Sequence, residues 1–129
     1  MNVATLKLVP LAYLLTCCIQ SITLCFMYAI KWTKAFERWI NQLSDKTTRI
    51  RLLRRLEKAQ RGLLGDVKPV GEGVYEIREF YGPGWRMYYM KHGDQLLIML
   101  GGGEKSRQAE DIKAAQKLAA RIREANDDR

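Results

Sequence analysis

Hydrophobic and polar positions along this chain follow two different periods, and each period predicts a different type of element. The run YAIKW, residues 28–32, predicts a short strand, and Thr33 suits the N-cap of the helix that follows. Spacing of three and four residues then predicts a helix from Lys34 to about Leu43. Its apolar face is expected to hold Phe36, Trp39, Ile40 and Leu43.

A second helix is predicted directly after the first. Ser44 or Asp45 supplies its N-cap, it reaches Arg61, and Gly62 suits the position just past its end. Its apolar stripe is expected at Ile50, Leu53 and Leu56. Two short helices with a tight connection predict an αα-hairpin.

Three strand-like runs follow a polar stretch punctuated by glycine, residues 62–73. The runs are VYEIREF (74–80), WRMYYMKH (85–92) and QLLIML (95–100), separated by turns at Gly82-Pro83-Gly84 and Gly93-Asp94. A final helix is expected to begin near Ser106, as its N-cap, and to fade into a frayed tail at 126–129. Its apolar face is expected to hold Ile112, Ala115, Leu118, Ala119 and Ile122.

The predicted order is therefore β-α-α-β-β-β-α, which places the chain in the α+β class. A small antiparallel sheet, with the first strand joined at an edge, would pack against the αα-hairpin and the C-terminal helix. The chain has 129 residues, enough for one domain, which we expect over 27–125.

The N-terminal segment, residues 1–26, differs from the rest. No residue from Leu8 to Ile30 is charged, and such a run is long enough to cross a bilayer. Three interpretations remain open from the residues alone: a membrane anchor, a secretory signal with Lys7 as its basic start, or upstream sequence before a true start at Met27.

Charge and cysteine content narrow the function. Lys plus Arg is 22 and Asp plus Glu is 14, a net charge of +8, which favours a polyanionic partner such as nucleic acid, or an acidic protein. All three cysteines, Cys17, Cys18 and Cys25, lie in the N-terminal segment. The remaining chain has no thiolate metal site or disulfide framework and suits a reducing compartment.

The stretch MLGGGEKSRQAED resembles a phosphate-binding loop but lacks its spacing. A P-loop needs glycine where this chain has Glu104 and Met99, so nucleotide binding is not expected. The single histidine, His92, sits beside a turn and is expected to be solvated, and Ser106 has no histidine to activate it. No metal or other cofactor is predicted.

Cations interleaved with aromatic residues form the candidate site. Arg and Lys beside aromatic rings on a sheet suit RNA, through phosphate contacts and base stacking. The alternative is that Arg78 and Arg86 form cross-strand ion pairs with Glu76 or Glu79 on a solvated face. The cations are Lys68, Arg78, Arg86 and Lys105, and the aromatic residues are Tyr75, Tyr81, Trp85, Tyr88 and Tyr89.

The register of the first hairpin decides whether the arginines meet. A two-residue turn would place Tyr81 opposite Arg86 and point the two arginines to opposite faces. A connection one residue longer would place Phe80 opposite Arg86 and Arg78 opposite Tyr88, and only this second register lets the arginines converge.

Two segments carry a family resemblance. GDVKPVGEGVYEIREFYGPGWRMYY followed by GGGEKSRQAEDIKAA resembles the RelE/ParE toxin superfamily, and most closely its HigB-like "addiction module killer protein" branch, from about Met27 to Ala120. Members of that branch start at the residue matching Met27. The resemblance therefore favours the upstream-start interpretation for residues 1–26.

The resemblance implies a cytoplasmic toxin of a type II toxin–antitoxin pair, a metal-independent, ribosome-dependent endoribonuclease that cleaves mRNA. Its partners would be the ribosome, mRNA and an antitoxin of the helix-turn-helix type. Arg78, Arg86 and Lys105 would stabilise charge on the phosphoryl oxygens, and Lys68 would act as general base. Contacts with the message are expected from Tyr81, Trp85, Tyr88, Arg107 and Gln108.

One departure from the family affects the chemistry. Several relatives carry a Tyr or His near the C-terminal end of the fold, whereas the helix after Ser106 has neither, so the general acid stays unassigned. Two other functions remain open. They are a ParE-like toxin that inhibits DNA gyrase without RNA cleavage, and a basic protein anchored in the inner membrane through residues 8–26.

Overall fold

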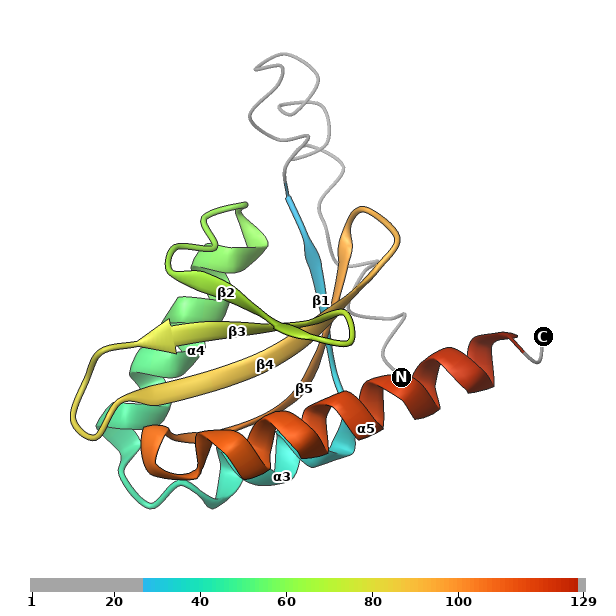
Figure 1. Cartoon of the computed structure of the whole chain (residues 1–129). Coiled ribbons are helices and arrows are strands. Elements are labelled where there is room, and N and C mark those ends of the chain that lie inside the picture. Colours follow the sequence, from blue (N-terminus) through green and yellow to red (C-terminus); the bar gives the residue numbers. More distant parts are fainter. Residues whose placement is uncertain (1–26, 128–129) are drawn as a thin grey trace, which may run out of the picture.

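The fold is a five-stranded sheet with helices on both faces (Figure 1). It is a computed structural model, and it describes residues 27–127. The elements are β1 (Ala29–Trp32), α3 (Lys34–Gln42), α4 (Lys46–Gln60), β2 (Val67–Gly71), β3 (Val74–Glu79), β4 (Trp85–His92), β5 (Leu96–Glu104), a 3-10 turn (Lys105–Arg107) and α5 (Gln108–Asp127).

The strand order is β1-β5-β4-β3-β2, in which β1 runs parallel to β5 and every other pair is antiparallel. The predicted α+β class is confirmed, and so is the placement of the first strand at an edge. Thr33 fixes this edge to the first helix: its Oγ1 donates to the carbonyl of Met99 at 2.8 Å and accepts from the backbone N–H of Phe36 at 3.2 Å.

Strand alternation divides the core into two layers. Met87 and Tyr89 of β4 pack against Phe36, Ile40, Leu52 and Leu56 of the αα-hairpin. Tyr88 and Met90, which point the other way, pack against Ala115 and Ala119 of α5. The candidate site lies on the face of the sheet that α5 covers, close to the start of this helix, where Gln108 contacts Glu76.

The α4 helix is capped as predicted but buries a different face. Asp45 caps its N-terminus, and Gly62 follows its end with a φ of 87°. The predicted stripe was partly wrong, because Leu52 is fully buried whereas Ile50 is half exposed. The buried side of the helix consists of Thr48, Leu52, Leu56 and Ala59. Thr48 is compatible with burial because its hydroxyl donates to Asp45 at 2.6 Å.

A strand was missed in the polar stretch 62–73. β2 forms there as an edge strand, where Pro69 is tolerated, and it pairs with β3 through an irregularity between Pro69 and Gly71. The turn back to β3 runs through Gly71, Glu72 and Gly73, all at positive φ. The order is therefore β-α-α-β-β-β-β-α.

Gly101, Gly102 and Gly103, expected to form a loop, continue β5 instead. They pair with Tyr88, Met87 and Arg86 across an irregularity between Tyr88 and Tyr89. Ser106 was expected to be a helix N-cap but lies inside the 3-10 turn that precedes α5. At the other end, α5 continues to Asp127, beyond the predicted start of fraying.

The predictions for residues 1–26 lie outside the described residues. Over residues 27–127, no helix has the length and hydrophobicity needed to cross a membrane.

Candidate functional site

Three of the four predicted cations lie on one face of the sheet. Cross-strand pairing aligns Lys68 with Glu76 and Glu76 with Tyr88, and in the neighbouring row it aligns Arg78 with Arg86. Directly paired residues point to the same side of an antiparallel sheet, and residues two apart do as well. Lys68, Arg78 and Arg86 therefore occupy two adjacent rows on the face that α5 partly covers.

The β3–β4 hairpin has a register that differs from both registers predicted from the sequence. Arg78 lies directly opposite Arg86, and Glu79 opposite Trp85, so the connection spans residues 80–84. Gly82 and Gly84 both adopt positive φ, and the N–H of Gly84 donates to the carbonyl of Tyr81 at 3.1 Å. The arginines converge, as the second alternative required, but through a longer connection.

Phe80 lies between the two arginines and was missed in the sequence. Its ring centroid is 5.5 Å from the Cζ of Arg78 and 5.8 Å from the Cζ of Arg86, and the residue is 72% exposed. The sequence did carry a signal for this contact. Side chains two residues apart in a strand point to the same face, so Phe80 could have been expected on the face of Arg78. An exposed ring flanked by two guanidinium groups can stack on a base.

Lys105 joins the cluster through the β3–β4 connection. Its backbone N–H donates to the carbonyl of Gly84 at 2.8 Å. A Cβ added at Gly84 would lie 3.4 Å from the Cβ of Lys105 and 3.7 Å from an Nη of Arg86. Gly84 thus lies next to both the exposed lysine and the buried arginine, and its φ of 86° is what favours glycine at this position.

Carboxylates hold both arginines. The guanidinium of Arg78 contacts Asp66 through two bonds, Nε–Oδ2 at 3.2 Å and Nη2–Oδ1 at 3.0 Å. Arg86 is buried, and its Nε lies 3.7 Å from Oε1 of the fully buried Glu76. Ion pairing with Glu76 was the alternative interpretation for Arg86, but this pair is buried rather than solvated.

Gln108 and Tyr88 complete the buried surroundings of Glu76. The Nε2 of Gln108 donates to Oε2 of Glu76 at 2.7 Å. Burial raises the pKa of the Tyr88 hydroxyl, and the nearby Glu76 carboxylate raises it further. Within the described residues, the Tyr88 hydroxyl, Glu76 Oε1 and Arg86 Nε have no hydrogen-bond partner. These polar atoms therefore lie beneath the first turn of α5 with unused hydrogen-bonding capacity.

Asp111 closes the covered end of the site. Burial raises the pKa of its carboxyl group, Arg107 opposes this shift, and Glu110 adds to it. Its carboxylate lies so close to Gly103 that any side chain there would overlap it. A carboxylate was not predicted at this position.

The predicted aromatic contacts separate into different places. Tyr88 is fully buried, so its ring offers no face to a base. Trp85 packs against Trp39 with centroids 6.4 Å apart, and the Cζ of Arg51 lies 4.1 Å from the Tyr81 ring, so both belong to the αα-hairpin side. Tyr75 stacks on Tyr89 at 5.4 Å, away from the arginines.

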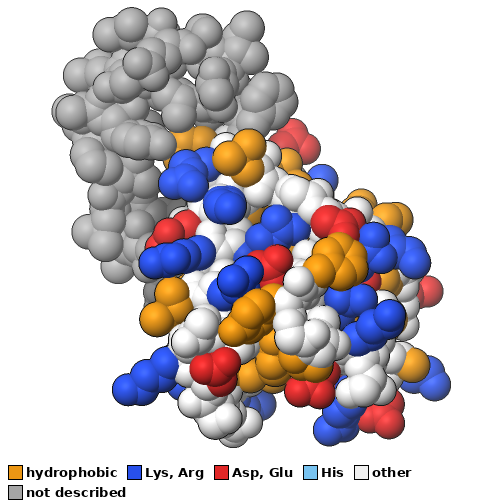
Figure 2. Space-filling model, turned by 90° about the vertical axis from the view of Figure 1, so that its left-hand side faces the viewer, with side chains coloured by type: hydrophobic (Ala, Val, Ile, Leu, Met, Phe, Trp, Pro, Cys, Tyr) orange, Lys and Arg blue, Asp and Glu red, His pale blue; other side chains and the backbone are white. Residues whose placement is uncertain are grey.

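The remaining predicted residues lie at the periphery. Arg107 is exposed and pairs with Glu110 at 3.0 Å, and His92 is exposed at the end of β4. Between Met27 and Asp127, no group of His, Cys, Asp and Glu side chains is arranged to hold a metal ion. Figure 2 views the side on which the β3–β4 connection lies, where Lys and Arg side chains are interleaved with exposed hydrophobic side chains.

Comparison with known proteins finds similarity both in sequence and in structure. No protein-family model matches the chain. An uncharacterized protein of Haemophilus influenzae is 37% identical over 93 residues, which cover 72% of this chain and 94% of that protein.

The toxin RelE of E. coli, a mutant in the free state, superposes with a TM-score of 0.58 at 16% identity, over 72% of this chain and 97% of RelE. The RelBE2 toxin–antitoxin complex of Mycobacterium tuberculosis superposes with a TM-score of 0.51 at 17% identity, over 61% of this chain and 99% of the matched chain. The chain therefore belongs to the family of this Haemophilus influenzae protein, and its fold is that of the RelE toxins.

Proposed function

We propose that this chain is the toxin of a type II toxin–antitoxin pair, from the HigB-like branch, and that it cleaves mRNA on the ribosome. The convergence of Arg78 and Arg86 on the exposed ring of Phe80, with Lys105 next to Gly84, carries the proposal. The RelE-like fold supports it, since the compared structures are a toxin and a toxin–antitoxin complex. The partners would be the ribosome, mRNA and a helix-turn-helix antitoxin.

The cations suit a metal-independent phosphoryl transfer. In this reaction the 2′ oxygen of one nucleotide bonds to the adjacent phosphorus, the bond from phosphorus to the 5′ oxygen breaks, and negative charge grows on the phosphoryl oxygens. Fixed cations stabilise that charge best when they do not need to reorient. Arg86 is fixed by burial and by Glu76, whereas Lys105 is exposed and free to reach the phosphate.

The proposed role of Lys68 is to accept a proton during cleavage. The lysine is exposed on β2, in the same row as Glu76 and one row from Arg78. The family resemblance implies a general base at this lysine, and in the proposed reaction it takes the proton of the 2′ hydroxyl. The leaving 5′ oxygen takes its proton from the ribosome or from solvent.

In this proposal, Phe80 rather than Tyr88 stacks on a base of the message. Stacking on an aromatic ring contributes about 1–3 kcal/mol per base and needs an open ring face. Phe80 has such a face, flanked by two guanidinium groups, whereas Tyr88 is fully buried. Gln108 is half-buried and bonded to Glu76, so its main role in the proposal is to hold this carboxylate in place.

The test is growth and mRNA integrity after induction of the full chain. Lys105→Ala is compared with Lys58→Ala, which changes another exposed lysine, on α4, and serves as the matched control. We expect growth arrest and new mRNA 5′ ends, mapped by primer extension, for the wild type and Lys58→Ala, and a large loss of both for Lys105→Ala. Arrest with intact messages and altered DNA supercoiling would instead indicate a gyrase-inhibiting toxin. No arrest from the wild type would overturn the toxin proposal.

A further inference from the structure

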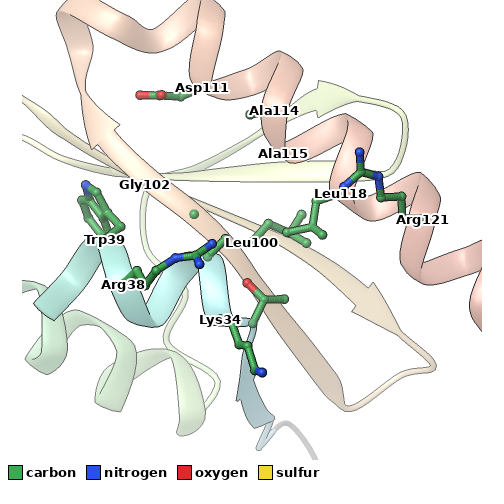
Figure 3. Close-up of a pocket in the computed structure, with 13 residues that line it drawn as sticks. Lys34, Arg38, Trp39, Leu100, Gly102, Asp111, Ala114, Ala115, Leu118 and Arg121 are labelled. Atoms are coloured by element: carbon green, nitrogen blue, oxygen red, sulfur yellow. The ribbon is translucent and has the colours of Figure 1, made fainter. Parts of the chain in front are cut away.

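A second surface lies where α3 and α5 diverge over β5. Figure 3 shows Lys34, Arg38 and Trp39 projecting from α3, and Leu118 and Arg121 from α5, around a hollow floored by Leu100 and Gly102 of β5. The hollow has a volume of about 450 Å³. We call it the α3–α5 groove. Arg78, Phe80 and Lys105 do not line it, but Asp111, at the covered end of the candidate site, lines one end of the groove and is the one acidic residue among the described residues around it.

The sequence creates this groove by ending one strand early and by using small residues. β1 pairs with β5 only as far as Met99, and the chain then turns into α3, so β5 continues without β1 beside it. Gly101 lines the groove, and a Cβ added there would meet no atom within 4 Å. Ala35, Ala114 and Ala115 keep the walls short.

The rim of the groove is cationic and unpaired. Lys34, Arg38 and Arg121 are exposed, and within the described part of the chain no carboxylate lies within ion-pair distance of them. This differs from the candidate site, where carboxylates hold both arginines. Lys34 and Arg38 are four residues apart on α3, so they lie one helical turn apart on the same side.

We propose that the α3–α5 groove is the docking site for an acidic, amphipathic helical segment of the partner antitoxin. This rests on the proposed function for the identity of the partner. Leucine-type side chains would fill the apolar floor at Leu100, Ala115 and Leu118, and carboxylates one turn apart would face Lys34 and Arg38. The apolar floor favours a helix over an RNA strand, and because the rim cations can also contact phosphates, an oligonucleotide is the competing occupant to be tested.

Binding is tested first with defined probes, so that the result does not depend on the toxin proposal. The probes are a labelled short helical peptide with leucines on one face flanked by glutamates, the same peptide with lysines for the glutamates, and a single-stranded oligouridylate. Fluorescence anisotropy on the full chain should show saturable binding of the acidic peptide and at least about tenfold weaker binding of the basic one. Absence of binding by the acidic peptide, or tighter groove-dependent binding of the oligouridylate, would overturn the proposal.

Two variants locate the binding. Arg38→Glu/Arg121→Glu reverses two rim charges, and Gly101→Val fills the floor with a side chain that suits a strand. Each should weaken peptide binding about tenfold or more, whereas the matched reversal Arg54→Glu/Lys58→Glu on α4 should not. Equal weakening by the α4 control would mean non-specific charge attraction and would overturn the docking site.

The antitoxin itself provides the second measurement. The protein that relieves growth arrest by the wild-type chain is co-expressed with each variant. Arg38→Glu/Arg121→Glu should still arrest growth, because its catalytic cluster is unchanged, but should escape neutralisation. Full neutralisation of this variant would overturn the groove as the docking site while leaving the toxin proposal intact. If the wild-type chain did not arrest growth, only the toxin proposal would fail, because the peptide experiment tests the groove independently.

Discussion

Gln108 donates a hydrogen bond from its Nε2 to Oε2 of Glu76 at 2.7 Å, and this bond ties the start of α5 to the middle of β3. The acceptor is a fully buried carboxylate whose other oxygen faces the guanidinium of Arg86. A buried charge is tolerated only when it is paired and hydrogen-bonded. Glu76, Gln108 and Arg86 therefore depend on one another, and the position of Arg86 depends on α5.

Glu76→Gln is expected to destabilise the protein by about 3–5 kcal/mol, because it leaves the Arg86 guanidinium buried without a charge partner. Replacing both residues, as in Glu76→Leu/Arg86→Met, should recover most of this loss, since no charge then remains buried. Urea unfolding of the three proteins measures the effect. Similar stability of Glu76→Gln and the wild type would show that the 3.7 Å pair contributes nothing.

Phe80→Ala should separate activity from stability. The ring is 72% exposed, so its removal should change the free energy of unfolding by less than about 0.5 kcal/mol, while RNA cleavage falls about tenfold through lost stacking. Phe80→Trp should retain cleavage. Leu63→Ala, at another exposed apolar residue (60%) that makes no ring contact with Arg78 or Arg86, is the control. Unchanged cleavage by Phe80→Ala would exclude stacking at this ring.

Adjacent glycines of β5 should respond oppositely to a methyl group. A Cβ at Gly102 would overlap the ring of Trp39, whereas one at Gly101 meets nothing within 4 Å. Gly102→Ala should therefore cost about 1–3 kcal/mol through overpacking, and Gly101→Ala should be neutral or slightly stabilising. Thermal unfolding measures both, and Trp39→Leu should rescue Gly102→Ala. Equal effects at the two positions would contradict the contact with Trp39.

Alkaline unfolding should depend on Tyr89. Burial raises the pKa of its hydroxyl to about 12 from 10.0, with Tyr28 and Tyr75 adding to the shift. Because the pKa is raised on folding, the stability linked to this group is complete below pH 10 and is lost as the pH rises through 12. Tyr89→Phe should move the alkaline unfolding midpoint upward, as followed by circular dichroism and tyrosinate absorbance. An unchanged midpoint would exclude this linkage.

A chain that begins at Met27 should keep the fold. The hydrogen bonds from Tyr28 N–H to the Gln60 carbonyl and from Ala29 N–H to the Gln95 carbonyl belong to residues after Met27, as do both core layers. We expect the unfolding temperatures of the full and shortened chains to agree within a few degrees. A chain that begins at Thr33 lacks β1 and should lose cooperative unfolding. Unfolding of the Met27 version would show that residues 1–26 contribute to the domain.

Much of the fold follows from local patterns, and the errors have local causes. Caps at Thr33 and Asp45, and strands β3 and β4, were predictable because periodicity and cap chemistry agree there. β2 was missed because Pro69 and its neighbouring glycines indicate a turn, although an edge strand tolerates them. The glycines of β5 were taken for a loop because nothing local shows that Trp39 and Asp111 occupy the space of their missing side chains.

The site was predictable in its residue types but not in its connections. Lys68, Arg78, Arg86 and Lys105 were expected together from charge and sequence resemblance, and pairing brings the first three onto one face. Phe80 and the role of Glu76 depended on the hairpin register, which glycines at 82 and 84 leave open because they permit several turn lengths. Burial of Tyr88 depended on the position of α5, which no local pattern specifies.

The parallel pairing of β1 with β5 has a consequence for synthesis. Thr33 and its partner Met99 are 66 residues apart, so the first strand has no neighbour in the sheet until β5 has been made. Contacts between such distant segments form late and slow folding. The first strand of the domain must therefore leave the ribosome before its partner in the sheet exists, and it stays unpaired while α3, α4 and strands β2 to β4 are made.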